Sequence, residues 1–109
     1  MIKVYKELDD ILLVKLDIKE ASLENGDAFK AEVIKLFEKQ QKSIAIDMSS
    51  VEYIDSSFLG SIVSVFKHLI SFKSELVLVG LSKDITNLFA LTRLDKVFKI
   101  YNNFDEISK

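Results

Sequence analysis

The sequence contains no cysteine and no proline, and it has only three glycines. Without cysteine the chain can form neither disulfides nor thiolate metal sites, so nothing in it requires an oxidising compartment. We therefore expect a cytoplasmic protein, and we expect no metal site. The glycines also lie too far apart for either common phosphate-cradling loop, so no nucleotide site is expected. They are Gly26, Gly60 and Gly80.

The charge balance is nearly even, with 15 basic against 17 acidic side chains and a net charge of −2. Such a chain lacks the broad basic field that nucleic acid or an anionic membrane would require. The N-terminal segment has no apolar signal core, and no apolar run reaches the roughly 18 residues of a membrane span. Neither nucleic acid nor a membrane is an expected partner.

The length and the apolar content fit one domain over residues 1–109, since 49% of the 109 residues are hydrophobic. Short β-branched runs alternate with segments of helical spacing, in the order β-β-α-β-α-β-α-β. The tail from Asn103 is expected to add one helical turn or more. Strands are expected at 2–5, 11–16, 43–47, 76–79 and 97–101. Helices are expected from Asp27 onward, from the start at Asp55-Ser56-Ser57 through an apolar stripe over 59–70, and after a cap at Ser82.

This order predicts an α/β fold with a mixed, mostly parallel sheet and helices packed against it, because alternating strands and helices form parallel crossovers. The apolar run Ile44-Ala45-Ile46 is typical of a central strand covered on both faces. In open sheets of this kind, sites form where the carboxyl ends of strands lead into helices. The connection 48–57 is therefore the expected functional edge, with Val51, Tyr53 and Ile54 as its apolar anchors.

Three consecutive residues at the start of the second long helix, Asp55, Ser56 and Ser57, are all good N-cap formers. Capping alone explains most serines at such positions. A helix needs only one cap, however, so at least one hydroxyl is spare. The helix dipole and the free backbone N–H groups at this end stabilise added negative charge, so a phosphate would be tolerated there.

The sequence around these residues resembles a known signature. Ile54-Asp55-Ser56-Ser57-Phe58-Leu59-Gly60 is similar to the Asp-Ser-Ser/Ala-Gly-Leu-Gly motif of STAS domains, particularly the anti-sigma factor antagonists of bacteria. Ile44–Val51 resembles the preceding strand and loop of that family, and Leu88–Phe98 its C-terminal stretch. The resemblance covers essentially the whole chain and implies a single STAS domain.

The resemblance implies a phosphoprotein that regulates transcription by partner switching. Ser57 matches the phosphoacceptor of the family, with Ser56 as the alternative, and Asp55 matches the acidic residue before them. The unmodified protein would bind an anti-sigma factor serine kinase and release the regulator that the kinase holds. The kinase uses ATP, and a phosphatase acting on phosphoserine resets the switch. The chain itself would be no enzyme, would need no cofactor, and would be a monomer or weak dimer.

The partner-binding surface implied by the resemblance includes two departures from the family pattern. Phe58 stands where the family usually has glycine. It lies one position before the apolar stripe of the second helix, and this offset favours an outward side chain that anchors or blocks a partner. The stripe comprises Leu59, Ile62, Val63, Phe66, Leu69 and Ile70. Ser22 stands near the position where proteins of the family often have an acidic residue that contacts the partner. The full set comprises Ser22, Asp55, Ser56, Ser57, Phe58 and Ser61.

Other functions remain as alternatives. The chain could be a STAS module of another assembly, such as a stressosome-like scaffold, a biofilm or secretion regulator or a ligand-sensing domain, with an altered switch or none. Asp47 ends a strand as a receiver-domain phosphoacceptor does, but Asp9-Asp10 lies in a hairpin turn, so we expect Asp47 to close a loop. An enzyme is disfavoured because Ser56 and Ser57 lack a G-x-S-x-G context and His68 is expected at the surface.

Overall fold

The computed structural model describes residues 1–107. The N-terminal hairpin forms as predicted, with strand β1 (Ile2–Glu7) antiparallel to strand β2 (Ile11–Leu16). Strand β1 extends two residues further than expected and carries an irregularity in its register between Val4 and Lys6. Because β1 is the edge of the sheet, most of its residues are exposed.

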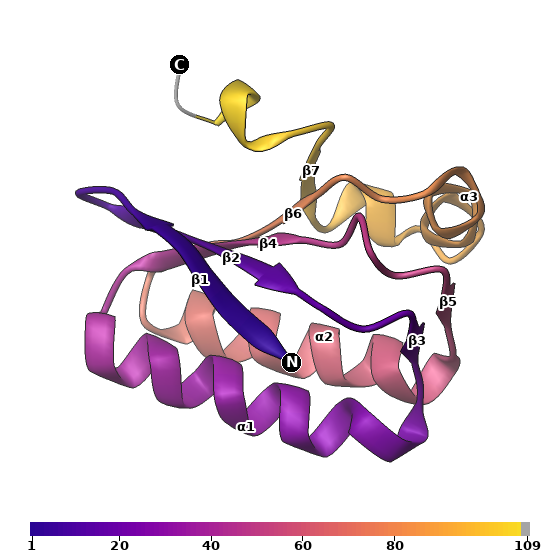
Figure 1. Ribbon diagram of the computed structural model, residues 1–109, viewed down its shortest axis with the longest axis horizontal. Helices are drawn as coiled ribbons and strands as arrows, with labels where there is room; N and C mark the ends of the chain where they lie inside the picture. Colours follow the sequence, from indigo (N-terminus) through magenta and orange to yellow (C-terminus); the bar gives the residue numbers. More distant parts are fainter. Residues whose placement is uncertain (108–109) are drawn as a thin grey trace.

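The remaining strands of the main sheet are parallel, which confirms the α/β prediction. The sheet order is β1-β2-β4-β6-β7, so each crossover places the next strand one position further along. Figure 1 shows the helices that make these connections. The elements are α1 (Leu23–Gln40), β4 (Ser43–Asp47), α2 (Ser56–Ser71), β6 (Leu76–Val79), α3 (Lys83–Leu91) and β7 (Lys99–Tyr101).

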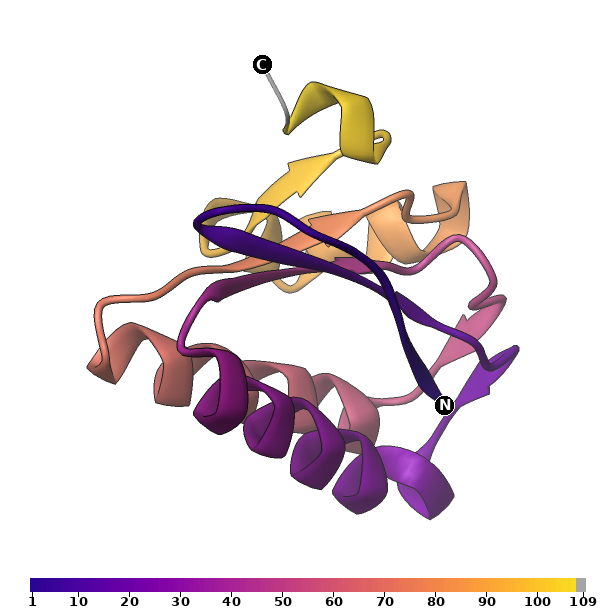
Figure 2. The same ribbon diagram turned by 60° about the vertical axis from the view of Figure 1, so that its left-hand side comes forward.

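Helices α1 and α2 lie side by side against one face of the sheet (Figure 2). Their buried side chains and those of α3 form the main hydrophobic core with the strands. The opposite face carries a smaller cluster, which the C-terminal segment and its short 3-10 helix (Phe104–Glu106) partly cover. Ile44, Ala45 and Ile46 are fully buried, as expected for a strand covered on both faces.

Two further boundaries differ from the sequence-based prediction. Helix α1 begins at Leu23 rather than Asp27, because Ser22 adopts an extended N-cap conformation and its N–H donates to Oδ1 of Asn25 at 2.8 Å. The predicted strand 97–101 is shorter: a 3-10 helix (Leu94–Lys96) precedes β7, and Val97 is exposed. Ile70, predicted on the apolar stripe of α2, is also half exposed near the end of that helix.

A second, two-stranded sheet was absent from the prediction. Strand β3 (Glu20–Ala21) pairs in parallel with strand β5 (Tyr53–Ile54). Each strand has only two residues, which is too short for a periodic signal. Their pairing brings the segment before α1 next to the segment before α2, so both helices begin at the same end of the molecule (Figure 1).

Candidate functional site

Helix α2 begins with a side-chain cap, as the sequence predicts. Asp55 is the N-cap in an extended conformation, and its Oδ1 accepts a hydrogen bond of 2.8 Å from the backbone N–H of Phe58. The carbonyl of Asp55 accepts the first helical bond, from Leu59, at 3.0 Å. The carboxylate therefore holds the first turn of α2 and also places negative charge at the positive end of the helix dipole.

The same carboxylate ties α2 to α1. Oδ2 of Asp55 accepts a hydrogen bond of 2.9 Å from the backbone N–H of Leu23, the first residue of α1. The N–H of Asp55 in turn donates to the carbonyl of Ala21 at 3.0 Å. One acidic residue thus fixes the two helix N-termini relative to each other.

Ser56 and Ser57 are the first two residues of α2, and both are exposed. Within residues 1–107, neither hydroxyl takes part in a hydrogen bond, so both are open to a modifying enzyme. Their backbone N–H groups precede the first intrahelical bond of the helix and are also free of partners in this part of the chain. The site therefore combines an accessible nucleophilic oxygen with donors that favour an anion.

Phe58 corrects one sequence-based expectation. Its side chain is fully buried rather than outward-facing, and its ring packs against that of Phe29 with a centroid distance of 4.7 Å. The reason is tertiary: α1 lies close to the first turn of α2, and the ring fills the space between them. An exposed aromatic anchor at this position is therefore excluded, and we leave Phe58 out of the proposed contact surface.

Ser22 and Ser61 lie at the same end of the molecule as Asp55, in different settings. Ser22 is the N-cap of α1, directly before the residue that Asp55 binds. Ser61 is half-buried and faces α1, where its Oγ lies 2.8 Å from the position that a Cβ on Gly26 would take. The predicted set thus gathers at one edge, with Ser61 directed partly toward the neighbouring helix.

Two exposed apolar side chains beside this edge were missed by sequence reasoning. Leu23 is 73% exposed and Tyr53 is 55% exposed, although Tyr53 was expected to anchor the loop. Val51 and Ile54 do anchor it, since both are buried. The sequence did carry a signal for the exposure of Tyr53. In a strand, consecutive side chains point to opposite faces, so a buried Ile54 predicts an exposed Tyr53.

The two remaining candidates have structural roles. Oδ1 of Asp47 accepts a hydrogen bond of 2.8 Å from the N–H of Ser49, so Asp47 closes the loop after β4 as expected. His68 is half-buried rather than a surface residue, with its ring 6.0 Å from that of Phe37 in an edge-on arrangement. Its Nε2 atom has no hydrogen-bond partner in the described part of the chain, so no partner positions it as a general base.

No helix within residues 1–107 combines the length and the apolar character that a membrane span requires.

Comparison with known proteins places these features in a family. The sequence model of the STAS domain matches residues 3–107. A Thermotoga maritima protein described as an anti-sigma factor antagonist is 35% identical to this chain, and the alignment covers 94% of this chain and 90% of the Thermotoga protein. The crystal structure of a Thermotoga maritima protein with the same description is 34% identical to this chain, has a TM-score of 0.84, and covers 95% of this chain and 89% of that one. The Anti-sigma-B factor antagonist of Listeria monocytogenes is 33% identical over 82% of this chain and 90% of its own length.

The structures of Bacillus SpoIIAA, named an anti-sigma factor antagonist, share the fold at low identity. The unphosphorylated form has a TM-score of 0.72 at 12% identity, covering 99% of this chain and 94% of that one. The phosphorylated form has a TM-score of 0.73 at 14% identity and covers 99% of this chain and 97% of that one. These two structures show the shared fold, and the match over residues 3–107 with the relatives above 30% identity shows that the chain belongs to the STAS domain family.

Proposed function

We propose that this protein is a cytoplasmic anti-sigma factor antagonist whose binding to an anti-sigma factor serine kinase is switched off by phosphorylation of Ser57. In this role the chain is the ligand and the substrate of the kinase, and it performs no catalysis itself. A phosphatase acting on phosphoserine returns it to the binding state. The protein works as a monomer or weak dimer.

The observation that carries this proposal is the Ser57 hydroxyl, which is exposed, unbonded within the described residues and held at the start of α2. Asp55 fixes that helix start through its bonds to Phe58 and Leu23. A kinase can therefore reach the oxygen without unfolding the helix. The names of the relatives from Thermotoga and Listeria support the same class of function.

The charge of the modification explains how it would act. A phosphoserine adds about −1.5 to −2 charges at neutral pH. The N-terminus of α2 stabilises this charge, so the fold persists. The carboxylate of Asp55 lies two residues away, and a phosphate beside it gives the edge a strongly negative field. A partner that docks on the neutral hydroxyls loses its contacts and meets this field instead.

The first experiment maps phosphate on the protein isolated from its native cells, by intact-mass and peptide mass spectrometry. The proposal expects one phosphate on Ser57, present in wild type and absent from a Ser57→Ala variant. A Ser56→Ala variant is the matched control and should keep the modification. Phosphate on Ser56 alone would move the acceptor by one residue. No phosphate under any growth condition would favour a STAS interaction module of another assembly without a phosphoswitch.

A second experiment measures binding to the kinase that phosphorylates the chain in an extract supplied with ATP. Ser57→Ala should bind this kinase but resist modification, whereas Ser57→Asp should bind more weakly by its charge. Equal affinity of the two variants would contradict the switch. Wild-type protein treated with phosphatase provides the reference for full binding.

A further inference from the structure

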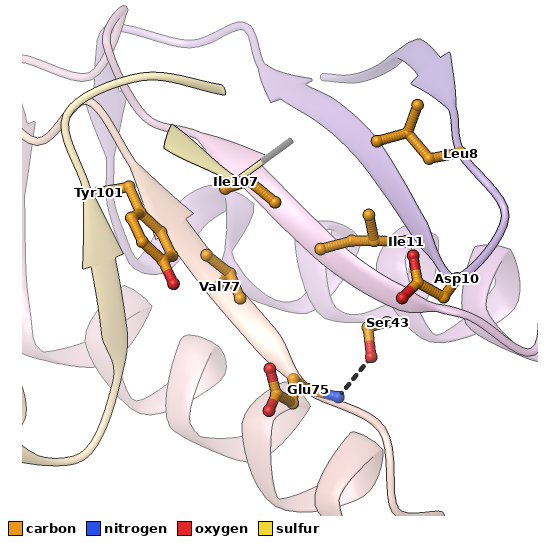
Figure 3. A pocket seen from close by; sticks show the side chains of 8 residues that line it. All are labelled: Leu8, Asp10, Ile11, Ser43, Glu75, Val77, Tyr101 and Ile107. Atoms are coloured by element: carbon orange, nitrogen blue, oxygen red, sulfur yellow. Dashed lines mark hydrogen bonds between the residues drawn. The ribbon is translucent and has the colours of Figure 1, made fainter. Parts of the chain in front are cut away.

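A cavity of about 440 Å³ lies on the sheet face opposite helices α1 and α2, outside the site described above (Figure 3). Its floor is apolar and includes Ile11 of β2 and Val77 of β6. Ile107, just after the last 3-10 helix, lines it from the C-terminal segment. This volume falls within the range of about 300–1,000 Å³ that is usual for small-molecule sites.

The cavity lies at the other end of the parallel strands from Ser57. Ile11 and Ser43 are the first residues of β2 and β4, and Glu75 directly precedes β6. Ser57, in contrast, follows the carboxyl ends of the strands. The two regions therefore share no residue, and occupancy of the cavity does not require any change at the start of α2.

One side of the cavity is polar, and the other is apolar. Figure 3 shows the polar groups of Tyr101, Glu75, Ser43 and Asp10 following one another along one side. Oγ of Ser43 accepts a hydrogen bond of 2.9 Å from the backbone N–H of Glu75, which leaves its own proton free to donate. The cavity thus has the amphipathic lining typical of a site for a small organic molecule.

The charges of the lining select the class of ligand. Both charged residues that line the cavity, Asp10 and Glu75, are acidic. Glu75 is already paired with Lys99, whose Nζ lies 3.0 Å from its Oε1. Asp10 makes no ion pair within residues 1–107, so its carboxylate remains available. The two lysines bonded to lining residues are already engaged: Lys42 pairs with Glu7 and donates to the carbonyl of Leu8, and Lys99 pairs with Glu75. A cationic group would therefore gain Asp10 as a partner.

We propose that this cavity binds a small amphipathic amine. The ammonium group pairs with the carboxylate of Asp10 at the polar side, and the apolar part of the molecule covers Ile11, Val77 and Ile107. The ligand needs both parts. A purely polar cation would leave the apolar floor exposed to water, and a carboxylate would meet Asp10 with like charge.

Three probes with the same chain and different head groups test this proposal: octylamine, octanol and octanoate, each titrated below its micellar concentration. Amide chemical shifts of the ¹⁵N-labelled protein provide the measurement. Octylamine should cause saturable shifts at Ile11, Ser43 and Val77 and should bind more tightly than octanol, and octanoate should bind least. Equal binding of all three probes, no saturable shift, or shifts centred elsewhere would overturn the proposal.

Variants of Asp10 and of the neighbouring Asp9 show whether the amine pairs with the Asp10 carboxylate itself or responds only to the negative charge of the whole turn. Asp10→Asn should weaken octylamine binding by about three- to five-fold, the range of a partly solvated ion pair. Asp9→Asn removes the same charge one position earlier in the turn and should leave the affinity nearly unchanged. Equal effects of the two variants would contradict a pairing with Asp10. An Ile107→Trp variant, which fills the cavity from the half-buried end of the described chain, should abolish binding without loss of the fold.

Discussion

Oδ2 of Asp55 accepts a hydrogen bond from the backbone N–H of Leu23, 32 positions earlier in the chain, at 2.9 Å. The other oxygen of the same carboxylate caps the helix that carries Ser56 and Ser57. Asp55 therefore does two structural tasks at once, and it does both beside the proposed phosphorylation site. This arrangement makes the acidic residue of the signature a determinant of the shape of the site.

Replacement of Asp55 should destabilise the protein measurably. In Asp55→Ala both bonds are lost, and we expect a cost of about 2 kcal/mol, from roughly 1 for the cap and a similar amount for the bond to Leu23. Urea denaturation measures this difference. Ser82→Ala is the matched control, because Ser82 caps only α3 through its bond to Ile85. It should cost about 1 kcal/mol, and a cost for Asp55→Ala no larger than this would contradict the double role.

The glycines Gly60 and Gly80 should respond to alanine in opposite directions. A Cβ on Gly60 meets no atom within 4 Å, and the residue lies in α2, so Gly60→Ala should stabilise by about 0.5–1 kcal/mol. Gly80 has φ of +70°, and a Cβ there would lie 3.1 Å from Oδ1 of Asp47. Gly80→Ala should therefore destabilise by about 1–2 kcal/mol. Thermal unfolding of both variants checks the two signs.

The close approach of Gly26 and Ser61 predicts a coupling between the two helices. A Cβ on Gly26 would lie 2.8 Å from Oγ of Ser61 but 3.7 Å from its Cβ, so the hydroxyl must rotate away in Gly26→Ala. With Ser61→Ala already present, no such movement is needed, and Gly26→Ala should gain about 0.5–1 kcal/mol from helix propensity. In the wild-type background the gain should be smaller. A double-mutant cycle measures the difference, and strict additivity would refute the contact.

Charge at Ser57 should change binding without changing the fold. Ser57→Asp should alter the free energy of unfolding by less than about 1 kcal/mol, because a negative charge in the first turn interacts favourably with the helix dipole. Urea denaturation gives the stability, and amide spectra report the fold. Unfolding of the Ser57→Asp variant would contradict the proposed mechanism, which requires that the fold tolerates negative charge at this position.

The exposed pair of Lys3 and Asp17 predicts a titration shift. The ammonium of Lys3 lies 2.9 Å from Oδ2 of Asp17 and lowers the pKa of that carboxyl, first by its hydrogen bond and then by its charge. A lowered carboxyl pKa contributes stability above the ordinary pKa, and the contribution is lost as the pH falls through the lowered value. NMR titration should find a higher pKa for Asp17 in Lys3→Met. An unchanged pKa would show that the pair does not persist in solution.

The fold could be read largely from the sequence because its main elements carry strong local signals. The run 44–46 indicated a strand covered on both faces, and the spacing of Leu59, Ile62 and Leu69 indicated α2. The cap at Ser82 was also correct, and Asp55 is the one of the three predicted cap formers that caps α2. Capping is predictable because it depends on the residue and its immediate neighbours. These features are local, so a single sequence is enough to reveal them.

The orientation of Phe58 and the two-stranded sheet could not be read in this way. The position of Phe58 on α2 is one residue from the main stripe, and only the proximity of α1, with Gly26 at the contact, turns that side into a buried one. The pairing of β3 with β5 joins segments more than 30 residues apart, and neither has a pattern of its own. Both depend on contacts between distant parts of the chain.

The sequence by itself determined the α/β order and a capped helix start among Asp55, Ser56 and Ser57, because these follow from short-range periodicity and capping. The tertiary structure decided which neighbours surround those hydroxyls: Leu23 is held there by Asp55, and Phe58 turns away to fill the space against Phe29. It also decided that residues from four strands, from the turn after β1 and from the C-terminal segment meet in one cavity. Packing of distant segments sets these positions, and no local pattern records it.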